Sequence, residues 1–253
     1  MLISIYSDST AIPRRALISI AETWPEILAS MYRTKFGKEF FFINRSFGGI
    51  QFKELLKLFK RDSKYYFNDR NANDLNSQSI CVFTSGIVDG APRPITYKLK
   101  LLSKIPFVGL KLWEIIVGYL SKFRPKIQSH FAYTTVPIDE FRIALQDLAE
   151  ISLKLNIFVI LLETPMPHSN LEIRSPGIIQ SIKTFNTTKK MIASSYEHIR
   201  YVELADSFNE ELYLSAEDGH HFNVAGHTLI ADILYLEILD ILDILKRTEN
   251  KYH

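Results

Sequence analysis

The first ten residues, MLISIYSDST (residues 1–10), contain the feature that decides the fold. A short apolar run, LISIY at 2–6, is followed at once by the polar side chains of Ser7, Asp8 and Ser9. A continuous apolar run of this length, rich in isoleucine, is typical of a strand buried on both faces of a parallel sheet. The polar residues then stand at the carboxyl end of the strand, where open parallel sheets bind their ligands.

Four further runs have the same character and predict strands at 40–44, 79–85, 156–163 and 199–205. Apolar residues at helical spacing predict helices between them, at 24–36, 52–60, 139–155, 177–196 and 224–246. Thr23 and Glu26 fit a capping box at the start of the first helix, and Asn223 fits the N-cap of the last. This alternation predicts an α/β fold, a five-stranded parallel sheet with helices on both faces.

The composition fits one globular domain over residues 1–253, because 47% of the residues are hydrophobic and 23% are charged. The formal net charge of +2 is too small to indicate a nucleic-acid partner. Cys81, the single cysteine, falls in a predicted strand, so we expect a buried core residue and no disulfide. The first apolar run lacks the flanks of a signal peptide, and we expect a cytoplasmic protein.

One segment interrupts the alternation of strands and helices. No strand is predicted between Asp89 and His130, and the stretch 95–127 holds seven lysines and arginines against one acid, Glu114. Long connections usually carry structure or function, so we expect a helical insertion after the third strand. One interpretation is a helical cap with solvated lysines. The other is a peripheral contact with a membrane surface or a lipid-linked glycan, which basic and aromatic side chains suit.

Ser9, Asp218 and His221 are candidates for a nucleophilic site. A serine hydroxyl becomes a nucleophile when a base takes its proton, and that base is usually a histidine oriented by a carboxylate. Asp218 precedes His221 by three residues, a spacing that brings a carboxylate to an imidazole within one turn. Taken singly, these residues also fit a polar turn and a cap. The spacing favours His221 over His220 as the base, and His227 is expected on a helix face.

Glycine-containing segments follow the second and third predicted strands. Gly49, in NRSFGGI (44–50), suits an oxyanion hole shared with the N–H of Ser9, although an ordinary turn glycine is the alternative. SGIVDGAPR (85–93) places Gly86 and Asp89 at the same edge of the sheet. The convergence of these segments favours a single site there.

These segments together resemble the SGNH (GDSL-type) hydrolase superfamily. The blocks Gly-Asp-Ser, an isolated Gly, Gly-x-Asn-Asp and Asp-x-x-His correspond here to 7–9, Gly49, 86–89 and 218–221. The resemblance implies a flavodoxin-like three-layer sandwich and a serine esterase without a cofactor. It also implies that Ser9 is the nucleophile, His221 the general base and acid, Asp218 its orienting partner, and Gly49 an oxyanion donor.

The sequence departs from the family pattern at two positions. Ser7 replaces the first glycine, and Val88 replaces an asparagine that serves the family as the third oxyanion donor. The side chain of valine cannot donate a hydrogen bond. Gly-x-x-Asp followed by Ala-Pro-Arg resembles a variant in relatives linked to glycan biosynthesis, which implies that Arg93 binds an anion or a carbonyl group. A salt bridge between Arg93 and Asp89 is the alternative.

The resemblance therefore implies an esterase that removes an acyl group, expected to be acetyl, from an O-acylated carbohydrate or a related small ester. Asp8, Gly86, Asp89 and Arg93 are its expected substrate-binding residues. An O-acyltransferase of polysaccharide biosynthesis is the first alternative, because it would use the same site. A non-catalytic glycan- or partner-binding module is the second, and Val88 is its main support. No metal is expected, because the histidines lack a familiar ligand spacing.

Overall fold

The computed structural model describes residues 1–14, 17–37, 40–67, 79–93, 109–121, 123, 126, 133–204 and 208–249. Its main sheet has five parallel strands in the order β2-β1-β3-β6-β7. They are β1 (Leu2–Ser7), β2 (Phe41–Ser46), β3 (Ser79–Thr84), β6 (Ile157–Leu162) and β7 (Ile199–Val202). All five predicted strands are present, and the predicted α/β fold is confirmed.

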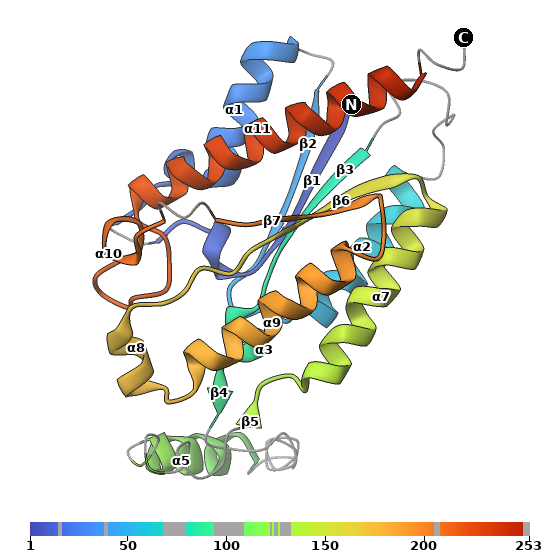
Figure 1. Ribbon diagram of the computed structural model, residues 1–253. Coiled ribbons are helices and arrows are strands. Elements are labelled where there is room, and N and C mark those ends of the chain that lie inside the picture. The colour runs from blue at the N-terminus through green and yellow to red at the C-terminus, as the bar shows by residue number, and fades with distance from the viewer. Residues whose placement is uncertain are drawn as a thin grey trace.

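Helices cover both faces of the sheet (Figure 1). One layer consists of α1 (Trp24–Phe36) and α11 (Val224–Glu249), and the other of α2 (Phe52–Tyr66), α7 (Ile138–Lys154) and α9 (Ile178–Ala193). Side chains alternate between the two faces of a strand, and β1 shows this directly. Leu2 and Tyr6 pack in the core under α2, α7 and α9, whereas Ile3 and Ile5 pack in the core under α1 and α11.

The strand β2 is not buried on both faces, contrary to the expectation from its apolar sequence. It lies at the edge of the sheet, and Phe41 is 61% exposed. The helix layers centre on the inner strands, so an edge strand keeps one side open to solvent. Continuous hydrophobicity therefore predicted the strand correctly but not its burial.

The start of α1 also differs from the prediction. Thr23 does not form the expected capping box with Glu26, because its hydroxyl donates to the carbonyl of Ile20 at 2.7 Å. The capping box forms one turn earlier, where Ser19 and Glu22 bond reciprocally around a short 3-10 helix, η2 (Ile20–Glu22). At the last helix the predicted cap is present, since the amide oxygen of Asn223 accepts the N–H of Gly226 at 2.9 Å.

Short elements join the main ones at the carboxyl edge of the sheet. They are η1 (Ser9–Ala11), α3 (Ile87–Gly90), α8 (Ser169–Arg174), α10 (Glu210–Tyr213), and the antiparallel pair β4 (Pro92–Arg93) and β5 (Tyr133–Thr134). The pair β4–β5 lies at the base of the predicted insertion and was not predicted, because two-residue strands have no readable periodicity.

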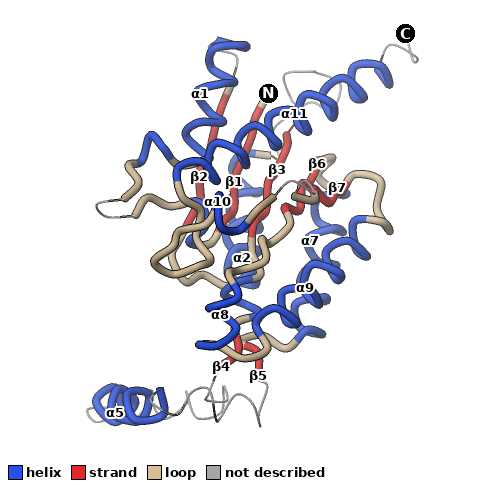
Figure 2. Tube along the Cα trace, turned by 60° about the vertical axis from the view of Figure 1, so that its left-hand side comes forward, coloured by secondary structure: helices blue, strands red, loops and turns tan. Residues whose placement is uncertain are grey.

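Within the insertion the structure describes helix α5 (Gly109–Ser121), together with residues 123 and 126. This helix lies beyond β4 and β5, away from the sheet, in both views (Figures 1 and 2). The remaining lysines and arginines of the insertion lie outside the described residues: Lys98, Lys100, Lys104, Lys122 and Arg124. Among the helices that are described, none is long and apolar enough to cross a bilayer.

Candidate active site

The site lies where the order of the strands reverses. The chain passes from β1 outward to β2 and then returns to the other side of β1 as β3. Ser9 follows β1 and Gly86 follows β3, so both stand at the carboxyl edge of the sheet at this reversal. Ser7, which replaces the first family glycine, is fully buried, and its hydroxyl bonds to the hydroxyl of Thr84 on β3. The replacement therefore ties together the ends of two central strands.

Asp8 holds the turn that carries Ser9. Its Oδ1 atom accepts the N–H of Thr10 at 3.0 Å and the hydroxyl of Thr10 at 2.8 Å, and so caps η1. The carboxyl group is 1% exposed, and burial raises its pKa. The carboxyl group of Asp8 thus bonds within the turn, and its expected contact with substrate stays a prediction.

Ser9, His221 and Asp218 form one continuous chain of hydrogen bonds. The Nε2 atom of His221 lies 2.8 Å from the Oγ atom of Ser9, and its Nδ1 atom lies 2.9 Å from Oδ2 of Asp218. A carboxylate accepts only, so this pattern assigns the ring proton to Nδ1 and leaves Nε2 to accept from the serine hydroxyl. The structure therefore brings together the three residues that the sequence singled out, although 212 positions separate Ser9 from His221.

A tight loop produces the spacing between Asp218 and His221. Oδ1 of Asp218 accepts the backbone N–H groups of His220 and His221, each at 3.1 Å. Arg14 forms an ion pair with Oδ2 of the same carboxylate, and Arg174 donates to its main-chain carbonyl at 2.8 Å. Neither arginine was singled out from the sequence, because Arg14 stands in an irregular segment and Arg174 ends α8, a helix too short to show a periodic pattern.

These contacts keep the carboxyl group of Asp218 ionised. Burial acts to raise its pKa, but the hydrogen bonds from His221 and from the backbone of His220 outweigh burial and hold the pKa well below its ordinary value. An ionised carboxylate at Nδ1 stabilises the imidazolium that forms when His221 takes a proton. The electrostatics of the loop therefore suit a base at Nε2.

Two further histidines support this loop. The Nδ1 atom of His220 lies 3.2 Å from the carbonyl of Asp218, and the ring of His220 lies against His221 with centroids 4.1 Å apart. The backbone N–H of His168 donates to the carbonyl of Gly219 at 2.8 Å. A Cβ atom on Gly219 would lie 2.9 Å from the Cβ atom of His168, so the two segments pack too closely for a side chain at position 219. Both histidines thus hold the loop in place.

Gly49 lies on the exposed loop that follows β2. Its φ angle of +72° favours glycine, and nothing lies within 4 Å of the position where a Cβ atom would stand. Phe47 donates its N–H to the carbonyl of Ser7 at 3.0 Å, which ties this loop to the end of β1. Gly49 therefore follows by two residues Phe47, whose backbone contacts the segment that leads to Ser9.

Residues 86–89, which follow β3, are tightly packed at Gly86 and Asp89. The φ angle of Gly86 is +134°, and a Cβ atom there would collide with the hydroxyl of Thr164. Asp89 is fully buried, and its two carboxyl oxygens lie 3.0 and 3.2 Å from the N–H of Phe52 at the start of α2. Burial raises the pKa of Asp89 to about 7. Asp89 therefore anchors the start of α2, and its expected contact with substrate stays a prediction.

Val88 and Arg93 are the other two residues of this region that the sequence singled out. Val88 is half-buried on α3 and brings no donor to the position where the family has asparagine. The backbone of Arg93 forms β4, but its side chain lies outside the described residues. Its expected role in binding an anion or a carbonyl group thus stays a prediction.

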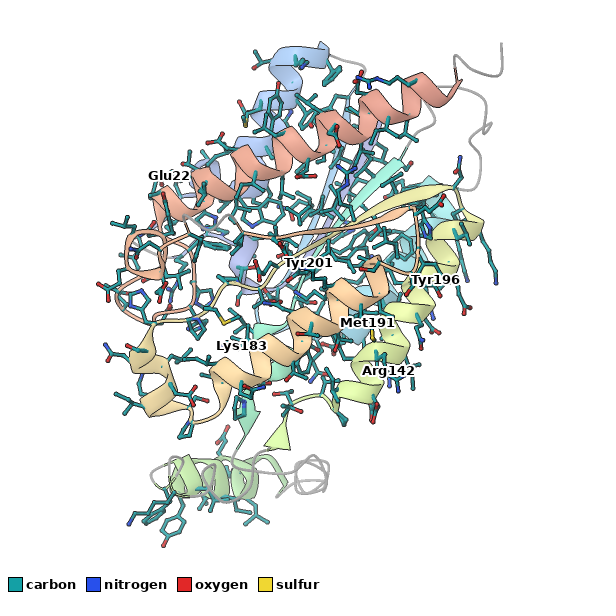
Figure 3. The ribbon with its side chains drawn as sticks, viewed as in Figure 1. Glu22, Arg142, Lys183, Met191, Tyr196 and Tyr201 are labelled. Carbon is teal, nitrogen blue, oxygen red and sulfur yellow. The ribbon has the colours of Figure 1, made fainter. Side chains whose placement is uncertain are left out.

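Sequence reasoning missed a buried lysine beneath this block. Lys189 of α9 is 2% exposed, and its Nζ atom donates to the carbonyl of Leu162 at 2.9 Å and to the hydroxyl of Thr164 at 2.8 Å. Burial lowers its pKa to about 8, against the opposing influence of the carboxylates of Asp8, Glu163 and Asp89. In the sequence nothing distinguishes it from an ordinary solvated lysine of an amphipathic helix. Lys183 and Met191 occupy the exposed side of the same helix (Figure 3).

Asp218, His220 and His221 also bring their potential ligand atoms within 4.8 Å of one another. The carboxylate of Asp218 and the imidazole of His221 also form the hydrogen bonds described above. A metal ion bound by these three residues would therefore compete with the hydrogen bonds that link Asp218, His221 and Ser9.

Comparison with solved structures supports the three-layer α/β fold. A lipase/acylhydrolase from Enterococcus faecalis is similar, with a TM-score of 0.59 and 16% identity over 94% of each chain. A psychrotrophic esterase from Pseudoalteromonas sp. has a TM-score of 0.59 and 16% identity over 96% of this chain and 98% of that one. A variant of an acetylxylan esterase from Geobacillus stearothermophilus has a TM-score of 0.56 and 15% identity over 94% and 93%. No family model and no curated protein matches the sequence.

The fold that the resemblance implied is thus confirmed over nearly the whole chain. The four short blocks were sufficient to predict it, although identity to each of these structures is at most 16%.

Proposed function

We propose that this protein is a serine esterase that removes an acyl group, with acetyl expected, from an O-acylated carbohydrate or a related small ester. The observation that carries the proposal is the hydrogen-bonded chain from Ser9 through His221 to Asp218, with distances of 2.8 and 2.9 Å. A serine hydroxyl bonded to an imidazole, with an ionised carboxylate behind the ring, is the arrangement that acyl transfer to serine requires.

The chemistry follows from these positions in two half-reactions. The Oγ atom of Ser9 attacks the ester carbonyl while Nε2 of His221 takes the hydroxyl proton. The tetrahedral oxyanion accepts hydrogen bonds from the N–H groups of Ser9 and Gly49. His221 then gives its proton to the leaving alkoxide, and an acyl-serine remains. Water attacks the acyl-serine with His221 as base, which releases the carboxylic acid and restores the Ser9 hydroxyl.

The absence of a donor at Val88 limits the rate that this site can reach. Removal of one oxyanion donor costs on the order of 100-fold or more in kcat. We therefore expect efficient turnover of esters with good leaving groups and slower turnover of alkyl esters.

The printed names of the structural neighbours support the choice of substrate class. Several of them are acetylxylan or acetyl-xylooligosaccharide esterases. The esterase from Pseudoalteromonas sp. has a structure inhibited by monoethylphosphonate, which makes a phosphonate a suitable probe for a related site.

Labelling with a fluorophosphonate tests the nucleophile. We expect the native protein to be labelled, Ser9→Ala to be unlabelled, and Ser195→Ala, a change at an exposed serine after α9, to behave as the native protein does. Persistent labelling of Ser9→Ala would contradict the assignment. A native protein that neither accepts the label nor hydrolyses p-nitrophenyl acetate would instead favour the non-catalytic binding module.

A second assay separates water from sugar as the acyl acceptor. The protein is incubated with acetylated xylo-oligosaccharides, with and without unacetylated acceptor sugars, and free acetate and acylated acceptor are both measured. We expect acetate as the main product. Acylated acceptor formed at the expense of acetate would replace the esterase by an O-acyltransferase that uses the same acyl-serine.

A further inference from the structure

Helix α5 carries large apolar side chains that no other described part of the chain covers. Ile115 is 68% exposed, Tyr119 is 62% exposed and Leu112 is 38% exposed. These positions are spaced three and four residues apart, so they share one face of the helix. Phe123, just past the end of the helix, is 43% exposed and packs against Tyr119 with ring centroids 5.4 Å apart.

The exposed apolar residues of α5 differ from others at the surface in their surroundings. Ile20 and Leu236 are as exposed as Ile115, but single exposed apolar residues are ordinary. Leu236 also belongs to a helix whose opposite face is buried in the core. None of the α5 side chains that the structure describes is buried. The side chains of α5 stand clear of the body of the protein (Figure 3). The helix therefore presents an apolar face that has no partner within the described chain.

The charge of the surrounding segment points to the partner. Seven lysines and arginines and one acid give the stretch 95–127 a charge of +6, whereas the whole chain carries +2, which leaves −4 for the remainder. Lys111, on α5 itself, is exposed. A basic segment with exposed isoleucine and aromatic side chains, on an otherwise acidic protein, complements an anionic lipid surface.

We propose that α5 is an interfacial helix that docks this protein on the surface of an anionic lipid bilayer. The apolar face enters the boundary between headgroups and acyl chains, and the exposed Lys111 lies among the headgroups. The helix has 13 residues and is therefore about 20 Å long, which is too short to cross the hydrocarbon core. It lies in the plane of the surface.

A lipid surface suits α5 better than a protein partner does. A helix about 20 Å long and 10 Å wide offers much less area than the roughly 800 Å² per partner that a stable protein interface buries. A bilayer has no such requirement, because electrostatic attraction adds to a modest apolar contact.

Docking through α5 turns the carboxyl edge of the sheet toward the membrane. The connection from β3 to α5 runs through α3 and β4, which lie at the same edge as Ser9. Substrates held at the bilayer surface would then meet this edge first. The proposal does not depend on the proposed esterase activity, because it concerns a surface and not the reacting groups.

Vesicle flotation of the full chain tests the proposal. We expect binding to vesicles of phosphatidylcholine with one third phosphatidylglycerol, no binding to phosphatidylcholine alone, and a decrease as salt is added. The double variant Ile115→Glu/Tyr119→Glu is expected to lower the partition coefficient about tenfold or more, because it adds two acids to the apolar face. Circular dichroism and Tm check that the variant is folded.

The matched control is Ile20→Glu/Leu236→Glu, which adds the same two charges at equally exposed apolar positions outside α5. It is expected to bind vesicles within about twofold of the native protein, since the apolar face of α5 is intact. No binding of the native protein to anionic vesicles, or equal losses in the two double variants, would overturn the proposal. A native dimer that dissociates on Ile115→Glu/Tyr119→Glu, without vesicle binding, would also overturn it in favour of self-association.

Discussion

The Nδ1 atom of His227 accepts the backbone N–H of Trp24 at 3.1 Å, which joins the first turn of α11 to the first turn of α1. His227 is 2% exposed, and its ring packs edge-on against Phe222 with centroids 5.7 Å apart. Protonation at Nδ1 would remove the acceptor and place a charge in the core. Burial, and then the neighbouring His221, accordingly lowers the pKa of His227 to about 4.

This contact makes part of the stability depend on pH between 4 and 6.5. In that range the unfolded chain binds a proton at His227 that the folded chain does not, so the free energy of unfolding falls as the pH falls. The contribution amounts to about 3 kcal/mol over the whole window. In His227→Asn an amide oxygen can still accept the Trp24 N–H, but the group does not titrate.

Urea denaturation of both proteins at a series of pH values checks this. The free energy of unfolding of the native protein, relative to His227→Asn, is expected to decrease as the pH falls from 6.5 to 4. Asp89, whose pKa is raised to about 7, contributes with the opposite sign, but it is present in both proteins and cancels. A difference that stays constant across this window would contradict the role assigned to His227.

Asp218→Asn tests the orientation of His221, the proposed catalytic base. An asparagine can keep the backbone contacts of Oδ1, but it no longer favours the proton on Nδ1 of His221, so Nε2 loses its role as acceptor. We expect kcat for p-nitrophenyl acetate to fall by about 10³ to 10⁴, with KM little changed. A loss below about tenfold would show that the carboxylate does not orient the base.

The sequence predicted the elements that depend on local patterns. The five strands were found because they are continuous apolar runs, and most of the site was found because its residues follow strand ends or precede the last helix. Burial was not predictable at the same level, since FFFIN reads like a central strand and yet forms the exposed edge strand β2. The position of a strand in the sheet depends on long-range pairing, which a local pattern does not encode.

The same limit applies to the orientation of side chains at the site. Asp8 and Asp89 were expected to face a substrate because they stand beside site residues in the sequence. In the structure their carboxyl groups turn inward to backbone N–H groups at the start of η1 and of α2. Lys189 was missed because only the packing of α9 against β6 reveals that this lysine is buried.

Gly86→Ala is expected to destabilise the protein strongly. A Cβ atom there would collide with the hydroxyl of Thr164, and a φ angle of +134° is strained for any residue with a side chain. We expect the free energy of unfolding to fall by about 3 kcal/mol, from backbone strain and overpacking together. Gly177→Ala is the matched control, because Gly177 also has a positive φ angle, +87°, but no atom within 4 Å. Its loss should be limited to about 1 kcal/mol, and equal losses at the two positions would exclude the steric explanation.

Lys189→Met removes a buried cation that interacts with the carboxyl groups of Asp8 and Asp89. Removal of one partner leaves buried charges uncompensated, so we expect the free energy of unfolding to fall by about 3 to 5 kcal/mol between pH 7 and 8, where Asp89 is ionised and Lys189 is still charged. The loss should be smaller below pH 7, because Asp89, whose pKa is raised to about 7, is then protonated and no longer needs the cation.

Lys190→Met provides the control for this last change. Lys190 is the next residue on α9, and it forms an exposed ion pair with Glu203, a kind of contact that contributes little to stability. Urea denaturation of both variants above and below pH 7 separates the two positions. If Lys189→Met cost no more than Lys190→Met, or cost the same at both pH values, the buried ammonium group would not be what balances the carboxyl groups beneath Ser9.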